Sequence, residues 1–180
     1  MKYFKRITGE RVYLSPVNPE DYEIYAKWLN DYEITQFYLS PTPVFSLANA
    51  KSFFEERALK GHNFAIVRRE DNVLIGYADL HDIATISRSA FLGVFIGEVE
   101  CRGCGYGTEA LRLLLNYGFD TLNLHSVSLS VVADNERGIA CYRKLGFTEY
   151  GRRRDSWFKF GRFFDTVYMD ILEDDFRGLR

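Results

Sequence analysis

The sequence predicts an α/β protein with a mixed, mostly antiparallel central sheet flanked by helices, and three features lead to this prediction. Strand and helix patterns alternate from end to end, without an internal repeat or a long linker. Residues 63–69 and 73–80 have the pattern of two strands joined by a short polar turn, which is typical of a hairpin. Residues 147–160 and 162–172 predict a second, longer hairpin. With a strand–helix–strand–helix segment between the hairpins, the sheet is expected to be mostly antiparallel.

The first elements are a short strand and two capped helices. Residues 11–14 favour a strand. Asn18, followed by proline, predicts a helix start, because asparagine caps free N–H groups and proline fits the first helical position. Ser46 is expected to cap a second helix, which ends at Gly61. Between these helices, residues 30–45 hold two prolines and several aromatic residues, and we expect an irregular segment.

The later elements alternate between strand and helix. Residues 90–96 predict a strand that leads into a glycine-rich loop, and apolar residues at helical spacing predict a helix over 108–119. The valine-rich residues 127–132 are typical of a buried strand. Asn135 is then expected to cap a helix that ends just before Gly146.

Length and composition favour one globular domain over residues 1–180. A chain of this length buries roughly 70% of the surface that it exposes when unfolded. Hydrophobic residues make up 47% and charged residues 27%, which excludes a disordered chain and a coiled coil. The formal net charge is −2, whereas a duplex-binding domain usually carries a strong basic excess. We therefore expect no nucleic-acid partner.

The sequence also predicts a cytoplasmic protein. No apolar run approaches the roughly 18–20 residues that span a bilayer, so no membrane partner is expected. The charged start is not followed by the apolar segment of a secretory signal. Cys101, Cys104 and Cys141 are few and odd in number, as in a reduced protein, and their spacing does not indicate a metal site.

The most informative stretch is a glycine-rich loop at residues 102–108, between a predicted strand and a predicted helix. Glycines let successive backbone N–H groups turn toward one point, and the start of the helix adds free N–H groups and a positive dipole end. The spacing matches neither a Walker loop nor a dinucleotide-binding fingerprint. Taken alone, the loop indicates either a phosphate site or a structural turn.

A second block follows the loop and makes the pattern specific. Together the two blocks resemble the GNAT superfamily of N-acetyltransferases. The acetyl-CoA motif of that family, Arg/Gln-x-x-Gly-x-Gly/Ala, is met by Arg102, Gly105 and Gly107. Its second signature, an asparagine followed by a Tyr-x-x-x-Gly-Phe helix end, is met by Asn135, Tyr142, Gly146 and Phe147. The start of the chain and the closing hairpin resemble the ribosomal-protein (Rim-type) and polyamine acetyltransferase branch, so that the resemblance covers nearly the whole chain.

The resemblance implies acetyl-CoA as co-substrate and a place for each part of it. The pantetheine arm would pair like an added strand with the main chain of Val94, Phe95 and Ile96. The pyrophosphate would be held by the glycine-rich loop, made of Arg102, Gly103, Cys104, Gly105, Tyr106, Gly107 and Thr108. Asn135 would reach the pantetheine amide, and Arg143 and Lys144 would lie near the nucleotide. Tyr142 would lie beside the thioester sulfur. One departure is that residues 97–101 are one residue longer than is usual before this loop.

The implied reaction is direct aminolysis of a thioester. It needs a neutral amine, a donor for the carbonyl oxyanion and a proton for the leaving thiolate. Backbone N–H groups of residues 94–96 are expected to supply the oxyanion donor, and Tyr142 is the expected catalytic residue. A tyrosine pKa of about 10 lies above a thiol pKa of about 8.5, so full proton transfer is uphill by about 2 kcal/mol. Tyr142 is therefore expected to donate a hydrogen bond to the developing thiolate.

The general base and the acceptor site are less evident. Asp79, His81 and Asp82, at the end of a predicted strand, are candidates for both roles, and the serines of the valine-rich strand are candidates to hold a water. Phe37 and Tyr38, in the irregular aromatic segment, are further candidates to bind the acceptor. At pH 7 roughly a tenth of an α-amine is neutral, against less than about a thousandth of a lysine-like amine. The lack of an evident base thus favours an α-amino acceptor.

The predicted function is an acetyl-CoA-dependent N-acetyltransferase that acts on a peptide or protein α-amino group or on a small amine, such as an amino acid or an antibiotic. A polyamine acceptor needs acidic residues to meet its charges, and residues 36–45 contain none. Polyamine acetylation and a CoA-binding regulatory module without transferase activity remain as alternatives. The oligomeric state, a homo-oligomer included, is left open.

Overall fold

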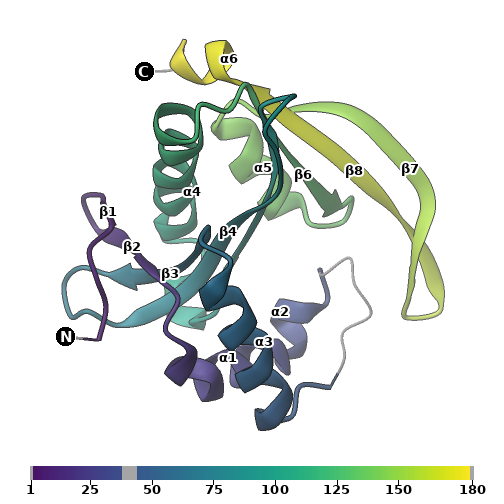
Figure 1. Ribbon diagram of the computed structural model, residues 1–180. Coiled ribbons are helices and arrows are strands. Elements are labelled where there is room, and N and C mark those ends of the chain that lie inside the picture. The colour runs from purple at the N-terminus through teal and green to yellow at the C-terminus, as the bar shows by residue number, and fades with distance from the viewer. Residues whose placement is uncertain (1, 38–43, 179–180) are drawn as a thin grey trace.

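The computed structural model describes residues 2–37 and 44–178 (Figure 1). Its strands are β1 (Ile7–Thr8), β2 (Val12–Pro16), β3 (Asn63–Arg68), β4 (Leu74–Ala84), β5 (Ser89–Ile96), β6 (Ser126–Val132), β7 (Thr148–Lys159) and β8 (Arg162–Leu172). Its α-helices are α1 (Tyr22–Leu29), α2 (Tyr32–Thr35), α3 (Leu47–Leu59), α4 (Tyr106–Asn116), α5 (Glu136–Lys144) and α6 (Glu173–Arg177). Two 3-10 helices, η1 (Pro19–Asp21) and η2 (Val99–Cys101), and one π-helical segment, η3 (Tyr117–Thr121), complete the list.

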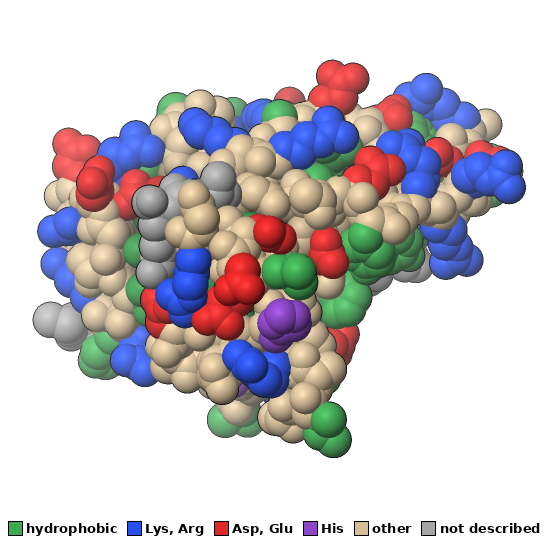
Figure 2. Space-filling model, turned by 90° about the horizontal axis from the view of Figure 1, so that it is seen from above, with side chains coloured by type: hydrophobic (Ala, Val, Ile, Leu, Met, Phe, Trp, Pro, Cys, Tyr) green, Lys and Arg blue, Asp and Glu red, His purple; other side chains and the backbone are tan. Residues whose placement is uncertain are grey.

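All of these strands form one sheet in the order β1-β2-β3-β4-β5-β6-β8-β7. Every neighbouring pair is antiparallel except β5 and β6, which run parallel. The predicted mixed, mostly antiparallel α/β fold is therefore confirmed. Figure 1 shows the long β7–β8 hairpin curving outward from one end of the sheet. On the face seen in Figure 2, acidic and basic side chains are interspersed.

The parallel pair β5–β6 opens into a wedge. The two strands are paired only from Ser89 and Ser126 to Phe91 and Ser128. Beyond that point β6 continues to pair with β8, while residues 92–96 of β5 are paired with β4 alone among the described strands. The edge of β5 that faces β6 is consequently left open over residues 92–96.

Alternating side chains give the sheet two apolar faces. One face is packed against α4 and α5, with Leu114 and Ile139 among the buried contacts. The other face of the first strands is packed against α1 and α3, where Tyr25 is stacked on Phe54. Helices therefore cover both faces of the sheet near the N-terminal strands. Near β5 and β6, helices α4 and α5 cover the face that includes Leu114 and Ile139 in its packing.

The predicted helix starts are confirmed at three caps. The Asn18 side chain accepts a hydrogen bond from the Glu20 N–H at 3.1 Å. Ser46 Oγ accepts from the Asn49 N–H at 3.1 Å, and Asn135 Oδ1 accepts from the Gly138 N–H at 3.0 Å. Each cap satisfies a donor that the first helical turn leaves free. Short polar side chains thus set these boundaries locally, which is why the sequence predicts them.

Other boundaries differ from the expectation. The segment expected to be irregular contains the short helix α2, capped by Asp31, whose side chain accepts from the Glu33 N–H. Helix α4 begins two residues earlier than expected, because Gly105 is in the left-handed region and acts as its N-cap. Strand β4 continues to Ala84 because it stays paired with β5 up to Ser89. These boundaries depend on neighbouring elements as well as on local pattern.

In the described part of the chain, no helix is long and apolar enough to cross a lipid bilayer.

Candidate active site

The open edge of β5 lies at the centre of the candidate site. Val94, Phe95 and Ile96 are paired through one edge with Ala78, Tyr77 and Gly76 of β4. In a strand the main-chain groups point alternately to the two edges, so some N–H and C=O groups of this segment point into the wedge. An extended ligand can pair with such an edge as an added strand does.

The glycine-rich loop forms a turn of main-chain donors next to this edge. Gly103 and Gly105 have φ angles of +75° and +86°, a conformation that favours glycine. Helix α4 follows directly, and its first helical hydrogen bond runs from the Glu109 N–H to the Gly105 carbonyl. The N–H groups of Tyr106, Gly107 and Thr108 precede that bond and belong to the positive end of the helix dipole. Loop and helix start together are suited to an anionic group such as a pyrophosphate.

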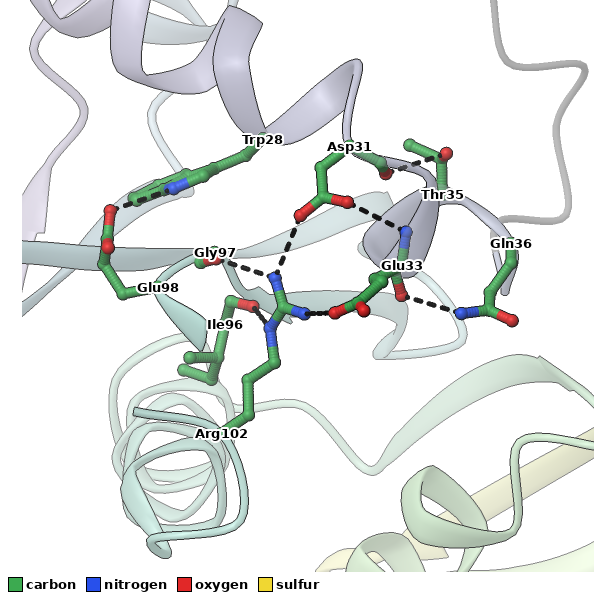
Figure 3. Close-up of polar contacts among 9 residues, drawn as sticks. All are labelled: Trp28, Asp31, Glu33, Thr35, Gln36, Ile96, Gly97, Glu98 and Arg102. Carbon is green, nitrogen blue, oxygen red and sulfur yellow. Dashed lines mark hydrogen bonds and ion pairs between the residues drawn. The ribbon is translucent and has the colours of Figure 1, made fainter. Parts of the chain in front are cut away.

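The Arg102 side chain is directed away from this turn (Figure 3). Its Nε donates to the Ile96 carbonyl at 3.2 Å, and its Nη2 donates to the Gly97 carbonyl at 2.8 Å. The same guanidinium forms ion pairs with Glu33 at 3.3 Å and with Asp31 at 3.6 Å. The side chain is only 10% exposed. Arg102 therefore joins the end of β5 to α2, and only its main chain is available to the loop.

Helix α1 is held at the same end of β5. The Trp28 Nε1–H donates to Glu98 Oε1 at 3.1 Å. Gly97 lies against the Trp28 ring so closely that a Cβ at this position would collide with it. A glycine is thus needed where the strand leaves the sheet. The residues between β5 and the loop include the 3-10 helix η2.

Helix α5 brings Tyr142 against the start of α4. Thr108 Oγ1 and Cys141 Sγ are 3.2 Å apart, which links the two helices. The Tyr142 ring packs edge-on against Phe147 with 6.0 Å between ring centroids. Burial raises the pKa of the Tyr142 hydroxyl well above its usual value, and nearby Cys141 raises it further. Tyr142 is therefore protonated at neutral pH and able to donate a hydrogen bond.

The other polar residues at the start and end of α5 differ in which of their polar groups are available to bind a ligand. Asn135 Oδ1 is used in capping the helix, so its amide NH2 is the part that remains for a ligand. Arg143 and Lys144 are exposed in the last turn of α5, and Arg143 lies 3.9 Å from Glu149. Lys144 is three residues after Cys141 and so shares its side of the helix, toward α4.

Asp79 and His81 form a pair at the closed end of the wedge. Asp79 is 8% exposed, and its Oδ2 is 2.9 Å from His81 Nδ1. The His81 ring is stacked on Phe91, the last residue of β5 that is paired with β6. Gly93 lies opposite Asp79, where a Cβ would collide with the carboxylate. The hydrogen bond to Asp79 raises the pKa of His81 above its ordinary value, although burial opposes the shift.

Asp82, the third candidate at this strand end, has a different environment. It is exposed, and its φ of +49° places it in the irregular part of the β4–β5 pairing. Among the described residues it makes no hydrogen bond to His81. Asp79 and His81 are therefore joined by a hydrogen bond, whereas Asp82 acts on His81 through its charge and adds to the rise of the His81 pKa.

The predicted acceptor residue Phe37 lines a cavity of about 160 Å³. Tyr38 lies outside the described residues. The walls come from the α2 segment, the end of β6 and the tip of the β7–β8 hairpin: Tyr32, Gln36, Phe37, Val132, Asp134, Trp157, Lys159, Phe160, Arg162 and Phe164. The sequence analysis missed the contribution of the hairpin tip. The aromatic residues on both sides of Gly161 were a signal, because a solvated turn has little need of them.

Proteins with similar sequences indicate the family of this chain. Residues 11–148 match the sequence profile described as "Acetyltransferase (GNAT) domain". The "Uncharacterized N-acetyltransferase p20" of Bacillus licheniformis is 27% identical over 174 residues, which cover 94% of this chain and 97% of that relative. YdaF of Bacillus subtilis (strain 168), whose name assigns it provisionally to ribosomal N-acetylation, is 33% identical over 108 residues, covering 60% of this chain and 58% of YdaF.

Among solved structures, the fold is similar to that of spermidine N-acetyltransferase from Vibrio cholerae in complex with CoA and spermine. The TM-score is 0.85 at 24% sequence identity, and the match covers 94% of this chain and 99% of that chain. At this identity the similarity concerns the fold.

Proposed function

Because this chain belongs to the GNAT acetyltransferase family and uses acetyl-CoA as co-substrate, we propose that its acceptor is an α-amino group, on a peptide, a protein or a small amine such as an amino acid. The observation that carries this proposal is that the carboxylates near the candidate acceptor cavity are paired, Asp31 and Glu33 with Arg102 and Asp134 with Arg162, which disfavours a polycationic acceptor. We assign the general base to the Asp79–His81 pair. It lies at the closed end of the wedge, beside the residue where β5 and β6 part. A titratable pair at that point is suited to take a proton from an attacking amine.

We assign the acetyl-CoA contacts to main-chain groups. In this proposal the pantetheine arm pairs with the open edge at Val94, Phe95 and Ile96, and the loop from Gly103 to Thr108 holds the pyrophosphate. The free edge and the positive-φ glycines support this assignment. The Asn135 amide NH2 faces a pantetheine carbonyl, and Arg143 with Lys144 lie on the nucleotide side. Arg102 contributes its main chain only, since its guanidinium is bound elsewhere.

The reaction follows from these assignments. His81, oriented by Asp79, accepts the proton that the amine loses as its nitrogen attacks the thioester carbonyl carbon. A β5 main-chain N–H donates to the carbonyl oxygen, which becomes negative in the transition state. The carbon–sulfur bond then breaks, and the Tyr142 hydroxyl donates to the departing sulfur. The raised pKa of Tyr142 makes full proton transfer less favourable, which supports the role of a hydrogen-bond donor.

Polyamine acetylation is the second candidate, because a similar structure is that of a spermidine N-acetyltransferase bound to spermine. The charges of this chain favour the first candidate. On α2, Asp31 and Glu33 are paired with Arg102, and residues 36–45 contain no acid. The charged residues that line the nearby cavity are Lys159 and the ion pair of Arg162 with Asp134. A polycation would therefore meet few free carboxylates here.

Thiol release from acetyl-CoA, measured over a panel of amines, tests the proposal. The panel contains an amino-acid amide, a short peptide with a free N-terminus, Nα-acetyl-lysine and spermidine. We expect the highest kcat/KM with one of the α-amines. A higher kcat/KM with spermidine or with the lysine ε-amine would contradict the α-amine assignment. Binding of acetyl-CoA without turnover of any amine would instead indicate a CoA-binding module.

A further inference from the structure

The cavity between α2 and the tip of the β7–β8 hairpin has the size of one side chain. Its volume of about 160 Å³ is close to that of an engineered cavity of about 150 Å³ that binds benzene. Five of its lining residues are aromatic: Tyr32, Phe37, Trp157, Phe160 and Phe164. Such walls favour an aromatic ring or a branched apolar group, since offset and edge-to-face ring contacts add to the gain from burial.

Contacts between α2 and the hairpin hold the cavity in place. Lys159 Nζ donates to the Thr35 carbonyl at 2.7 Å, and burial lowers the pKa of this lysine. The Tyr32 and Phe160 rings meet edge-on at 5.3 Å. The two walls are thus joined by a polar and an aromatic contact. A cavity formed before the ligand arrives binds at a lower entropic cost.

One donor in the wall has no partner among the described residues. Trp157 Nε1 is buried and makes no hydrogen bond to any described residue. Buried donors are nearly always hydrogen-bonded, so an unpaired indole N–H in a cavity wall indicates that a ligand or a water accepts from it. The carbonyl oxygen next to an α-amino group, in a peptide or an amino-acid amide, is an acceptor of this kind.

The charges of the lining are paired. Arg162 Nη2 is 3.1 Å from Asp134 Oδ2, and the Arg162 guanidinium lies 4.4 Å from the centre of the Phe164 ring. The carboxylate in the lining is therefore bound to an arginine, and the remaining charge is that of Lys159. This environment does not suit the positive tail of a polyamine.

The cavity and the Asp79–His81 pair flank the same wedge. Asp79 is opposite Gly93, two residues past the last β5–β6 pair, and Val132 in the cavity wall is four residues past that pair on β6. The cavity therefore adjoins the open part of the wedge on the β6 side, and the pair lies on the β5 side.

We infer that this cavity receives the side chain of the residue that is acetylated, and that the preferred acceptor is an α-amine with one aromatic or branched apolar side chain. The inference rests on the proposed function, because it takes the Asp79–His81 pair as the place of the reacting nitrogen. It adds the substrate class, which the family does not fix.

Two amides that differ only in their side chain test the inference. For the unmodified protein, kcat/KM with L-phenylalaninamide should exceed that with glycinamide by roughly 10–100-fold, the range expected from burying one apolar side chain. Phe164→Ala removes one wall, and we expect it to reduce this ratio at least fivefold. Equal kcat/KM values for the two amides with the unmodified protein would overturn the inference and leave the proposed function standing.

Phe163→Ala is the matched control. Phe163 immediately precedes Phe164 on β8, is 58% exposed, and packs against Phe158 on the opposite face of the hairpin. This variant should retain the ratio of the two amides. If both variants lose the preference for L-phenylalaninamide over glycinamide, the effect comes from disturbing the hairpin rather than from the cavity wall. That result would overturn the inference.

A binding measurement separates the inference from the proposed function. If neither amide is acetylated although acetyl-CoA binds, the proposed function fails. Calorimetric titration in the presence of CoA then compares the affinities for the two amides directly. At least tenfold tighter binding of L-phenylalaninamide would support the cavity assignment, and equal affinities would overturn it.

Discussion

At the scale of single residues, the environments of Tyr142 and His81 shift the pKa of each side chain and so determine its protonation state. Tyr142 is held in its neutral form because burial raises its pKa. His81 is shifted the other way, toward its charged form, because Asp79 accepts its hydrogen bond. Tyr142 therefore remains a hydrogen-bond donor at neutral pH, and His81 is protonated more readily than an ordinary histidine.

Replacement of Tyr142 tests the donor role. We expect Tyr142→Phe to lower kcat by roughly 10–1,000-fold, the range for loss of one positioned donor in the transition state. The KM for acetyl-CoA should change little, because the ring and its packing on Phe147 remain. Steady-state kinetics on an accepted amine give both values. Equal kcat values for the two proteins would show that Tyr142 serves packing alone.

The pH dependence of activity tests the base. Activity should fall with decreasing pH as His81 takes up a proton, with a midpoint above the ordinary histidine value because Asp79 raises its pKa. Asp79→Asn removes the carboxylate charge, so the midpoint should move to lower pH while the plateau of kcat falls. Profiles of kcat/KM against pH give the midpoint. An unchanged midpoint would exclude His81 as the group that titrates.

The same pair predicts a pH-dependent stability. The pKa of His81 is raised in the folded state, so its protonation stabilises the fold below the ordinary histidine pKa, and this contribution is lost as pH rises through the folded pKa. Asp79→Asn should therefore lower Tm more at pH 5 than at pH 9. Thermal melts of both proteins at the two pH values measure the difference. A larger loss at pH 9 would contradict the assigned direction.

At the scale of elements, Arg102 connects the two halves of the site. Its guanidinium binds carbonyls at the end of β5 and carboxylates on α2, and α2 also forms a wall of the acceptor cavity (Figure 3). A residue of the acetyl-CoA motif thus positions the segment that lines the proposed acceptor cavity. Arg102 is a positioning residue in this arrangement.

Arg102→Lys tests this connection, because lysine keeps the charge but cannot reproduce the planar, multidentate contacts. We expect the KM for the amine to rise at least fivefold, while the affinity for acetyl-CoA, which depends on main-chain groups of the loop, changes less. Glu33→Gln, which removes one partner, should shift the KM for the amine in the same direction by a smaller factor. A loss of acetyl-CoA affinity with an unchanged KM for the amine would refute the connection.

At the scale of the whole molecule, the sheet itself creates the binding wedge. Strands β5 and β6 can separate at one end because each remains hydrogen-bonded to its other neighbour, β5 to β4 and β6 to β8. Helices α4 and α5 start beside the wedge on one face of the sheet. The hairpin tip and the α2 segment line the cavity that we propose for the acceptor.

Acetyl-CoA should raise Tm, because the wedge and the loop exist only in the folded state. At a ligand concentration about 100 times Kd, the gain is about 2.7 kcal/mol. Gly105→Val should abolish the shift, since a β-branched residue is strained at a φ of +86° and the Arg11 side chain already lies 3.0 Å from the position of its Cβ. Gly151, where a Cβ would meet nothing within 4 Å, provides the control as Gly151→Ala. A full shift with Gly105→Val would remove the loop from the binding site.

The sequence by itself determined the features that depend on residues close together in the chain. Caps at Asn18, Ser46 and Asn135, and the turn of main-chain donors before α4, follow from local side chains and from glycine. The alternation of elements was likewise sufficient to predict the class of the sheet.

Only the tertiary structure decided which distant segments meet. It directed the Arg102 guanidinium toward α2, placed the Asp79–His81 pair beside the end of the β5–β6 pairing, and brought the hairpin tip against α2 through Lys159. The physical reason is that periodicity and capping specify local backbone conformation and the face that is buried, whereas contacts between segments far apart depend on strand order and register. The acceptor cavity consists of such contacts, and it is therefore visible only in the folded molecule.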